Sequence, residues 1–159
     1  MLAAANFAAA DKLRRFQNFA ANDVYAITNP DITRHYFFDL RVESQWSVGS
    51  KVQYINSDGV DIISGKILEI EPISKVVYSF RGHAAANGER DADSRVTFEI
   101  EALHANACKL TVIHDDFESE NTTYSNVGGG WPTILSGLKT YLETGKPLVL
   151  EADDIECGG

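Results

Sequence analysis

One histidine stands where the sequence could place an ionisable group inside an apolar interior. His114 follows Leu110 and Val112 at steps of two, so the three side chains share one face of an extended segment. On a cavity wall, His114 would hydrogen-bond a ligand or act as a general base with a shifted pKa. The alternative is a buried histidine that hydrogen-bonds a backbone carbonyl or a neighbouring side chain. The pattern leaves both interpretations open and favours the second.

Large amphipathic side chains and one arginine are the other candidates for ligand contact. Trp46 and Trp131 suit a cavity wall, and packing in the core is their alternative role. Tyr36 and His35 fall near the expected mouth of a cavity, where we favour packing for the tyrosine and exposure for the histidine. Arg81 could hold an anionic group, although a surface ion pair is the preferred interpretation.

The chain lacks the spacings of the common catalytic and metal-binding motifs. Its four histidines and two cysteines form neither C-x-x-C nor H-E-x-x-H. The glycines at 128–130 precede Trp-Pro rather than the Lys-Ser/Thr of a phosphate loop, and no G-x-S-x-G elbow occurs. We therefore expect no metal and no cofactor. His114 is the one candidate catalytic residue, so enzymatic activity stays uncertain.

The composition argues against several classes of partner. The 159 residues carry 23 Asp and Glu against 14 Lys and Arg, a net charge of −9, which disfavours nucleic acids and anionic membranes. No stretch approaches the roughly 20 apolar residues of a membrane span. Two cysteines and no evident signal peptide predict a cytoplasmic protein. The length fits one domain, which we expect to be a monomer or a weak homodimer.

The hydrophobic pattern predicts one α+β domain at 12–148, preceded by a flexible arm at 1–11 and followed by an acidic disordered tail at 149–159. A weak alternation at 12–20 predicts an edge strand, and Asn22 and Pro30 predict the starts of two short helices. From residue 41 the period changes to two. The predicted strands cover 41–46, 51–55, 60–70, 75–81, 94–102 and 107–115, with a mobile loop at 82–93. Gly65 leaves the register of the third of these strands open.

A long amphipathic helix follows the strands. The glycines at 128–130 predict a flexible stop, and Pro132 then suits the first turn of the helix. Gly145 is expected to end the helix as a C-terminal cap. The apolar side chains recur at steps of three and four: Ile134, Leu135, Leu138, Tyr141 and Leu142.

These elements predict a curved sheet that surrounds the helix. An antiparallel sheet must cover its apolar face, and only one long amphipathic helix is available for this. About six or seven antiparallel strands would therefore wrap around the C-terminal helix, with the two short helices closing one end of an interior hollow. We expect the inward side chains to contact a ligand there, namely Tyr36, Phe37, Trp46, Tyr78, Phe80, Phe98, Val112, His114, Trp131, Leu135 and Leu138.

Four short segments stand out along the predicted elements: Val-Tyr-Ala-Ile-Thr-Asn-Pro at 24–30, Val-Tyr-Ser-Phe at 77–80, the strand end His-Asp-Asp-Phe at 114–117 and Gly-Gly-Trp-Pro at 129–132. With the order of the elements, they resemble the START-like helix-grip (SRPBCC) superfamily over about residues 12–148. Together they are similar to the branch called activator of heat-shock-protein-90 ATPase homologue-like, whose members are mostly uncharacterised bacterial proteins. The first strand is shorter and more polar than in the family, which leaves its pairing open.

The resemblance implies a carrier of hydrophobic molecules, because the superfamily holds lipids, sterols, hormones and polyketides in its cavity. We therefore predict binding of a small lipid-like or polyketide-like molecule. An enzyme that acts on such a ligand, as the cyclases and aromatases of the superfamily do, is one alternative, with His114 as its acid or base. A module that activates a chaperone ATPase is another, by analogy with the family's namesake alone.

Overall fold

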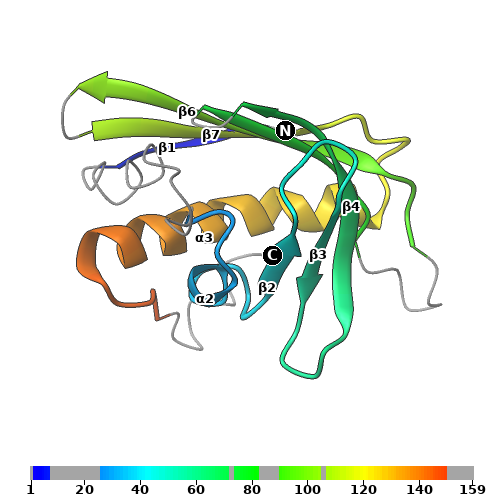
Figure 1. The fold of residues 1–159 in the computed structure, drawn as a ribbon, viewed down its shortest axis with the longest axis horizontal. Helices are drawn as coiled ribbons and strands as arrows, with labels where there is room; N and C mark the ends of the chain where they lie inside the picture. Colours follow the sequence, from blue (N-terminus) through cyan, green and yellow to red (C-terminus); the bar gives the residue numbers. More distant parts are fainter. Residues whose placement is uncertain (1, 8–25, 72–73, 83–89, 105–106, 150–159) are drawn as a thin grey trace.

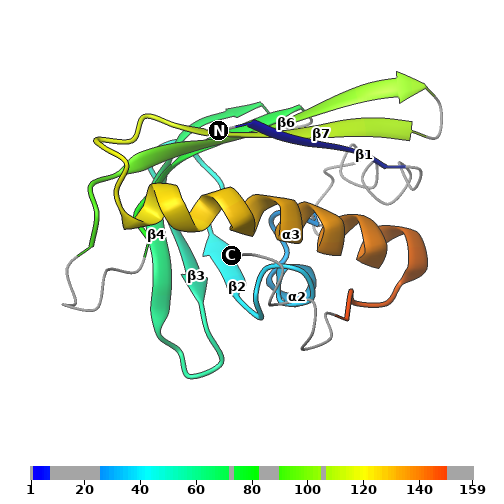
Figure 2. The ribbon, with the colours of Figure 1, turned by 180° about the vertical axis from the view of Figure 1, so that it is seen from behind.

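A seven-stranded antiparallel sheet bends around one long helix in the computed structural model (Figures 1 and 2), which confirms the predicted architecture. The structure describes residues 2–7, 26–71, 74–82, 90–104 and 107–149. The sheet order is β1-β7-β6-β5-β4-β3-β2. The elements are β1 (Leu2–Phe7), α2 (Pro30–Thr33), β2 (Arg41–Ser44), β3 (Lys51–Ile55), β4 (Asp61–Glu71), β5 (Lys75–Phe80), β6 (Ser94–His104), β7 (Ala107–Asp115) and α3 (Thr122–Thr144).

The inner face of the sheet and one face of α3 form a single core. Along β5 the side chains of Val76, Tyr78 and Phe80 are buried at steps of two, as an apolar sheet face requires. On α3 the buried apolar side chains recur at steps of three and four: Val127, Trp131, Ile134, Leu135, Leu138 and Leu142. Strands β2, β3 and β4 leave the plane of the other strands and pass around the helix (Figure 1).

Gly65 permits a close approach between β4 and β5. A Cβ atom added there would lie 1.7 Å from the backbone oxygen of Ser79, so no larger residue fits without separating the strands. The glycine itself pairs regularly with Val52. The irregularities of β4 lie elsewhere, opposite Tyr54–Ile55 at one end and between Ile67 and Glu69 at the other. Thus the register that the sequence left open is shifted by bulges rather than at the glycine.

Helix α3 begins ten residues earlier than the sequence predicted. The expected stop at 128–130 is wrong, because these glycines lie inside the helix, and Pro132 therefore lies in its interior rather than in its first turn. Two side-chain oxygens explain the earlier start: Asn121 Oδ1 accepts from Tyr124 N at 3.0 Å, and Asp91 Oδ2 accepts from Thr123 N at 2.7 Å. Such caps satisfy amide groups that have no partner within the helix.

The C-terminal end of α3 follows the prediction. Gly145 adopts a left-handed φ of 75° and its N–H bonds to the carbonyl oxygen of Tyr141 at 2.8 Å, which is a glycine cap. Near this half of the helix, Gly137 leaves room for the segment after α2. A Cβ atom at Gly137 would lie 3.3 Å from the Cβ of Tyr36.

The N-terminal part differs from the expectation of a flexible arm. Residues 2–7 form β1 and pair with β7 in a regular antiparallel register from Leu2 opposite Ile113 to Phe7 opposite Cys108. This pairing covers the edge of β7. The edge strand predicted at 12–20 and the beginning of the first short helix lie outside the described residues, as do 83–89 of the predicted loop and 150–159 of the predicted tail.

The second short helix is shorter than predicted. Asn29 caps it through a 2.8 Å bond from Asp31 N, and Pro30 occupies its first turn as expected. It ends at Thr33, and a turn continues to Phe38 and Asp39, which adopt positive φ values of 51° and 57°. Two successive residues with a left-handed backbone conformation cannot continue a right-handed α-helix, so the chain turns away from the axis of α2 here.

Candidate functional site

An apolar pocket of about 380 Å³ lies between the first half of α3 and the loop that joins α2 to β2. Side chains from β4 and from the end of β5 complete its wall, together with the backbone of Gly82. The lining residues are Phe37, Phe38, Leu40, Ile62, Ile63, Phe80, Gly82, Thr123, Asn126, Val127, Gly130, Trp131 and Ile134. None of them carries a formal charge.

Local irregularities of the backbone bring several of these side chains together. Consecutive residues of a regular strand point to opposite faces, but Ile62 and Ile63 both reach the pocket beside the register shift opposite Tyr54–Ile55. At the other wall the left-handed backbone of Phe38 holds its ring at the rim, where it is 59% exposed and meets Phe37 edge to face at 6.3 Å between ring centroids. The pocket therefore reaches the surface at Phe38.

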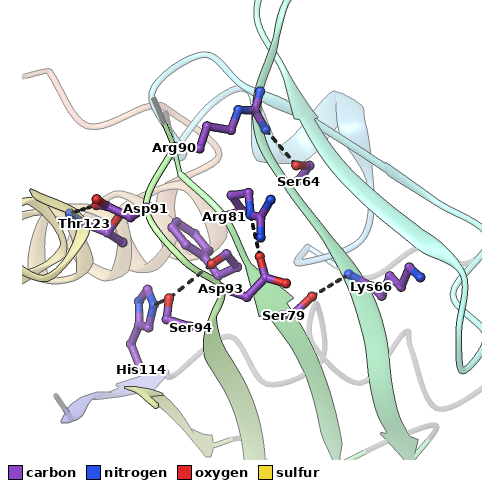
Figure 3. A network of polar contacts seen from close by, with 11 residues as sticks. Ser64, Lys66, Ser79, Arg81, Arg90, Asp91, Asp93, Ser94, His114 and Thr123 are labelled. Atoms are coloured by element: carbon purple, nitrogen blue, oxygen red, sulfur yellow. Dashed lines mark hydrogen bonds and ion pairs between the residues drawn. The ribbon is translucent and has the colours of Figure 1, made fainter. Parts of the chain in front are cut away.

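Two polar side chains interrupt the apolar lining at the beginning of α3. Asn126 is exposed, whereas Thr123 is buried and donates its hydroxyl proton to Asp91 Oδ2 at 2.7 Å. The same oxygen accepts Thr123 N, so one carboxylate holds both groups, as Figure 3 shows. Since a negative charge at a helix N-terminus is favourable, Asp91 also stabilises this end of the helix.

His114 lies behind the pocket wall rather than in it. The ring is fully buried, and Phe80 and Trp131 stand between it and the pocket, with ring centroids 4.7 and 6.0 Å from its own. Its Nδ1 accepts the indole N–H of Trp131 at 3.0 Å, and its Nε2 lies 2.7 Å from Ser94 Oγ. Ser94 in turn donates to the carbonyl oxygen of Phe80 at 3.2 Å (Figure 3).

This chain of bonds specifies the protonation of the imidazole. An indole N–H only donates, so Nδ1 must be unprotonated and Nε2 carries the proton. The proton of Nε2 points to Ser94 Oγ, whose own proton points to Phe80 O. Burial lowers the pKa of His114 from its ordinary value of 6.5 to about 4, against a smaller opposite effect of Asp115. His114 is therefore neutral near pH 7, and both nitrogens bind protein groups, as the second interpretation predicted.

Aromatic side chains fill the centre of the predicted hollow. Phe37 stacks on Tyr54 at 4.5 Å between centroids, Tyr78 stacks on Phe98 at 6.0 Å, and Trp131 meets Phe98 edge to face at 5.7 Å. The hydroxyls of Tyr54 and Tyr78 bond to each other at 2.8 Å. Burial raises the pKa of both tyrosines, so both stay protonated. The pocket adjoins this aromatic cluster through Phe37 and Trp131.

The structure brings three of the eleven predicted contact residues to the pocket, namely Phe37, Phe80 and Trp131. The other eight lie elsewhere. Seven are buried in the core: Tyr36, Tyr78, Phe98, Val112, His114, Leu135 and Leu138. The eighth, Trp46, is half-buried and packs against the edge of the core. The hydroxyl of Tyr36 donates a hydrogen bond to the carbonyl oxygen of Ala26 at 2.5 Å.

Sequence reasoning missed most of the pocket wall. The sequence pattern does not predict Phe38, Ile62 or Gly130 as ligand contacts, because their positions depend on a left-handed residue, a register shift and a helix that starts earlier than expected. A run of two aromatic residues at 37–38 before Asp-Leu was the available signal. Arg81 makes the surface ion pair that was the preferred interpretation, at 2.7 Å from Asp93 (Figure 3).

Within the described part of the chain, no group of three His, Cys, Asp or Glu side chains is arranged to hold a metal ion. The helices described there also include none with the length and apolarity that crossing a bilayer requires.

Comparisons with known proteins agree with this architecture. The family model described as activator of Hsp90 ATPase homolog 1-like protein matches residues 18–143, which confirms the predicted resemblance. The solution structure of the Aha1 dimer from Colwellia psychrerythraea is similar at a TM-score of 0.66 and 17% identity, over 92% of this chain and 97% of that one. No curated protein matches.

Two further solved structures share the fold. CalU16 from Micromonospora echinospora has a TM-score of 0.66 and 18% identity, over 98% of this chain and 78% of that one. An HSP90 activator from Plasmodium falciparum has a TM-score of 0.63 and 18% identity, over 92% of this chain and 96% of that one. At these identities the likeness establishes the fold alone.

Proposed function

Since this chain belongs to the family of activator of Hsp90 ATPase homologue 1-like proteins, we propose that it binds a small hydrophobic molecule in the pocket beside α3. The uncharged, mostly apolar lining of a volume of about 380 Å³ is the observation that carries this proposal. Ligand pockets in proteins typically measure roughly 300–1,000 Å³, so the molecule is at the small end of lipid-like or polyketide-like compounds.

The proposal assigns binding rather than catalysis. His114, the one candidate acid or base, is separated from the pocket by Phe80 and Trp131, and its two ring nitrogens bind Ser94 and Trp131. A general base needs a free lone pair within reach of the substrate. In this structure the only lone pair of the neutral imidazole accepts the indole proton.

Gly130 offers a direct test of ligand binding, because a side chain at this position would fill the pocket. A Cβ atom at Gly130 or at Gly129 meets nothing within 4 Å, but only Gly130 lines the pocket. Gly130→Leu should therefore occupy the cavity while the fold persists, and Gly129→Leu is the matched control on the exposed side of the same turn. The measurement is a dye-free thermal screen of all three proteins against a broad library of small hydrophobic compounds.

We expect compounds that raise the melting temperature of the wild type and of Gly129→Leu but not of Gly130→Leu. Ligands stabilise a protein in proportion to the logarithm of their concentration over Kd, so the shift should also grow with dose. A library without any stabilising compound, or equal shifts in both leucine variants, would show that the pocket is not the binding site.

Activation of a chaperone ATPase is the second candidate, supported by the fold shared with the HSP90 activator from Plasmodium falciparum. It predicts that adding the protein raises the ATPase rate of Hsp90. An unchanged rate over a range of protein concentrations that saturates a control activator would contradict it.

A further inference from the structure

We infer that the pocket selects a neutral aromatic ligand that carries a hydrogen-bond donor, of which a phenol is the simplest example, and that Thr123 recognises the donor. This inference rests on the proposed function, because it concerns the same pocket. It goes further by specifying that the ligand is uncharged, that its polar group is a hydrogen-bond donor, and which residue accepts that hydrogen bond.

The walls favour flat ring systems over flexible chains. Phe37, Phe80 and Trp131 surround the inner part of the pocket, and Phe38 stands at its rim. Aromatic pairs gain about 0.5–1.5 kcal/mol beyond the burial of their area when they stack offset or edge to face. The rings are themselves held in place, since Phe37 and Trp131 meet edge to face at 5.8 Å between centroids.

The hydroxyl of Thr123 can act toward a ligand only as an acceptor. Its one proton is donated to Asp91 Oδ2 at 2.7 Å, and an ionised carboxylate cannot return a proton. The lone pairs of Thr123 Oγ1 remain. A Cβ atom at Gly82 would lie 3.4 Å from this oxygen, and both residues line the pocket, so Gly82 places no side chain against the oxygen there. A ligand hydroxyl or amide N–H is therefore the complementary group.

Negative charge on the ligand is disfavoured at the same place. The Asp91 carboxylate lies directly behind the Thr123 hydroxyl, and none of the described residues that line the pocket carries a positive charge. The arginines of this region are engaged elsewhere: Arg81 pairs with Asp93 at 2.7 Å, and Arg90 binds Ser64 Oγ and a backbone oxygen at 2.8 Å. A buried anion without a cation or donors is costly, so a fatty acid or another carboxylate should be rejected.

Three probes with the same ring system separate these requirements. 2-Naphthol is neutral and has a donor, 2-methoxynaphthalene is neutral without a donor, and 2-naphthoate is an anion. Their affinities for the full-length wild type are to be measured by isothermal titration at pH 7. One net hydrogen bond corresponds to roughly a fivefold difference in Kd, so we expect 2-naphthol to bind about fivefold more tightly than 2-methoxynaphthalene and 2-naphthoate to bind most weakly.

Two variants of Thr123 test whether this residue causes the preference for 2-naphthol over 2-methoxynaphthalene. Thr123→Val keeps the shape and the backbone bond to Asp91 but removes the acceptor, so 2-naphthol and 2-methoxynaphthalene should then bind equally. Thr123→Ser keeps the hydroxyl and should preserve the preference. If the valine variant does not fold, Asp91→Asn replaces it: this change removes the negative charge and should reduce the disadvantage of 2-naphthoate.

The outcomes distinguish this inference from the proposed function. Equal affinities of 2-naphthol and 2-methoxynaphthalene for the wild type, or a preference that survives Thr123→Val, would overturn the role of Thr123 while the pocket stands. Binding of 2-naphthoate as tight as that of 2-naphthol would overturn the exclusion of anions. Failure of all three probes to bind would count against the proposed function itself and against this inference with it.

Discussion

Lowering the pH should destabilise this protein through His114 in a defined window. Above pH 6.5 the imidazole is neutral in the folded and in the unfolded chain, so its contribution to stability is fully present. Between pH 6.5 and about 4 the unfolded chain binds a proton that the folded chain does not, and the free energy of unfolding therefore falls with pH. Below about pH 4 both states are protonated and the loss ends.

The magnitude follows from the difference between the two pKa values. They are separated by roughly 2.5 pH units, and each unit corresponds to 1.36 kcal/mol. The expected loss between pH 7 and pH 4 is therefore about 3 kcal/mol. The physical reason is local: a proton on Nδ1 would face the indole N–H of Trp131, so protonation turns a 3.0 Å hydrogen bond into the contact of two donors.

Urea denaturation at half-unit steps from pH 7 to pH 4 measures this loss, with His114→Gln as the reference. Other titrating groups are common to both proteins and cancel in the difference. We expect the stability advantage of the wild type to shrink by about 3 kcal/mol across the window. Identical pH slopes for the two proteins would refute the reasoning. So would an imidazole titration by NMR in which His114 has an ordinary pKa or carries its neutral-state proton on Nδ1.

Three further substitutions test the packing. Gly65→Ala places a Cβ atom 1.7 Å from Ser79 O and should lower the free energy of unfolding by about 3 kcal/mol in a urea titration; a loss under 1 kcal/mol would mean that the strands separate readily. At Gly129→Ala the added Cβ atom meets no neighbour, so the substitution should raise the free energy of unfolding by about 1 kcal/mol. A decrease in the free energy of unfolding would contradict a helix at this position. Tyr54→Phe should cost about 1–2 kcal/mol because Tyr78 loses its partner; a double-mutant cycle without coupling would contradict the 2.8 Å bond.

Local patterns in the sequence were enough to predict most of the fold. Alternation at a period of two located six of the seven strands, because side chains of a half-buried strand must alternate between core and solvent. Steps of three and four located the C-terminal half of α3, and Gly145 marked its end. With a single long amphipathic helix to cover one apolar sheet face, the sheet had to bend around it. His114 is neutral and both of its ring nitrogens hydrogen-bond to protein groups, which agrees with the interpretation that the sequence favoured.

The start of α3 and the pocket depended on contacts between distant residues. Local preference placed a stop at 128–130, because glycine is a poor helix former, yet Asp91 caps Thr123 from across 32 positions and the helix extends through the glycines. The strand at 2–7 likewise depends on the free edge of β7.

The sequence by itself determined which side chains face inward, since alternation records burial. It could not decide which of those side chains leave a space between them. That depends on a register shift at Ile62, a left-handed backbone at Phe38 and aromatic rings that fill the centre of the core. Whether a core is full or hollow is a property of side-chain volumes in three dimensions, so only the tertiary structure located the pocket at one end of α3.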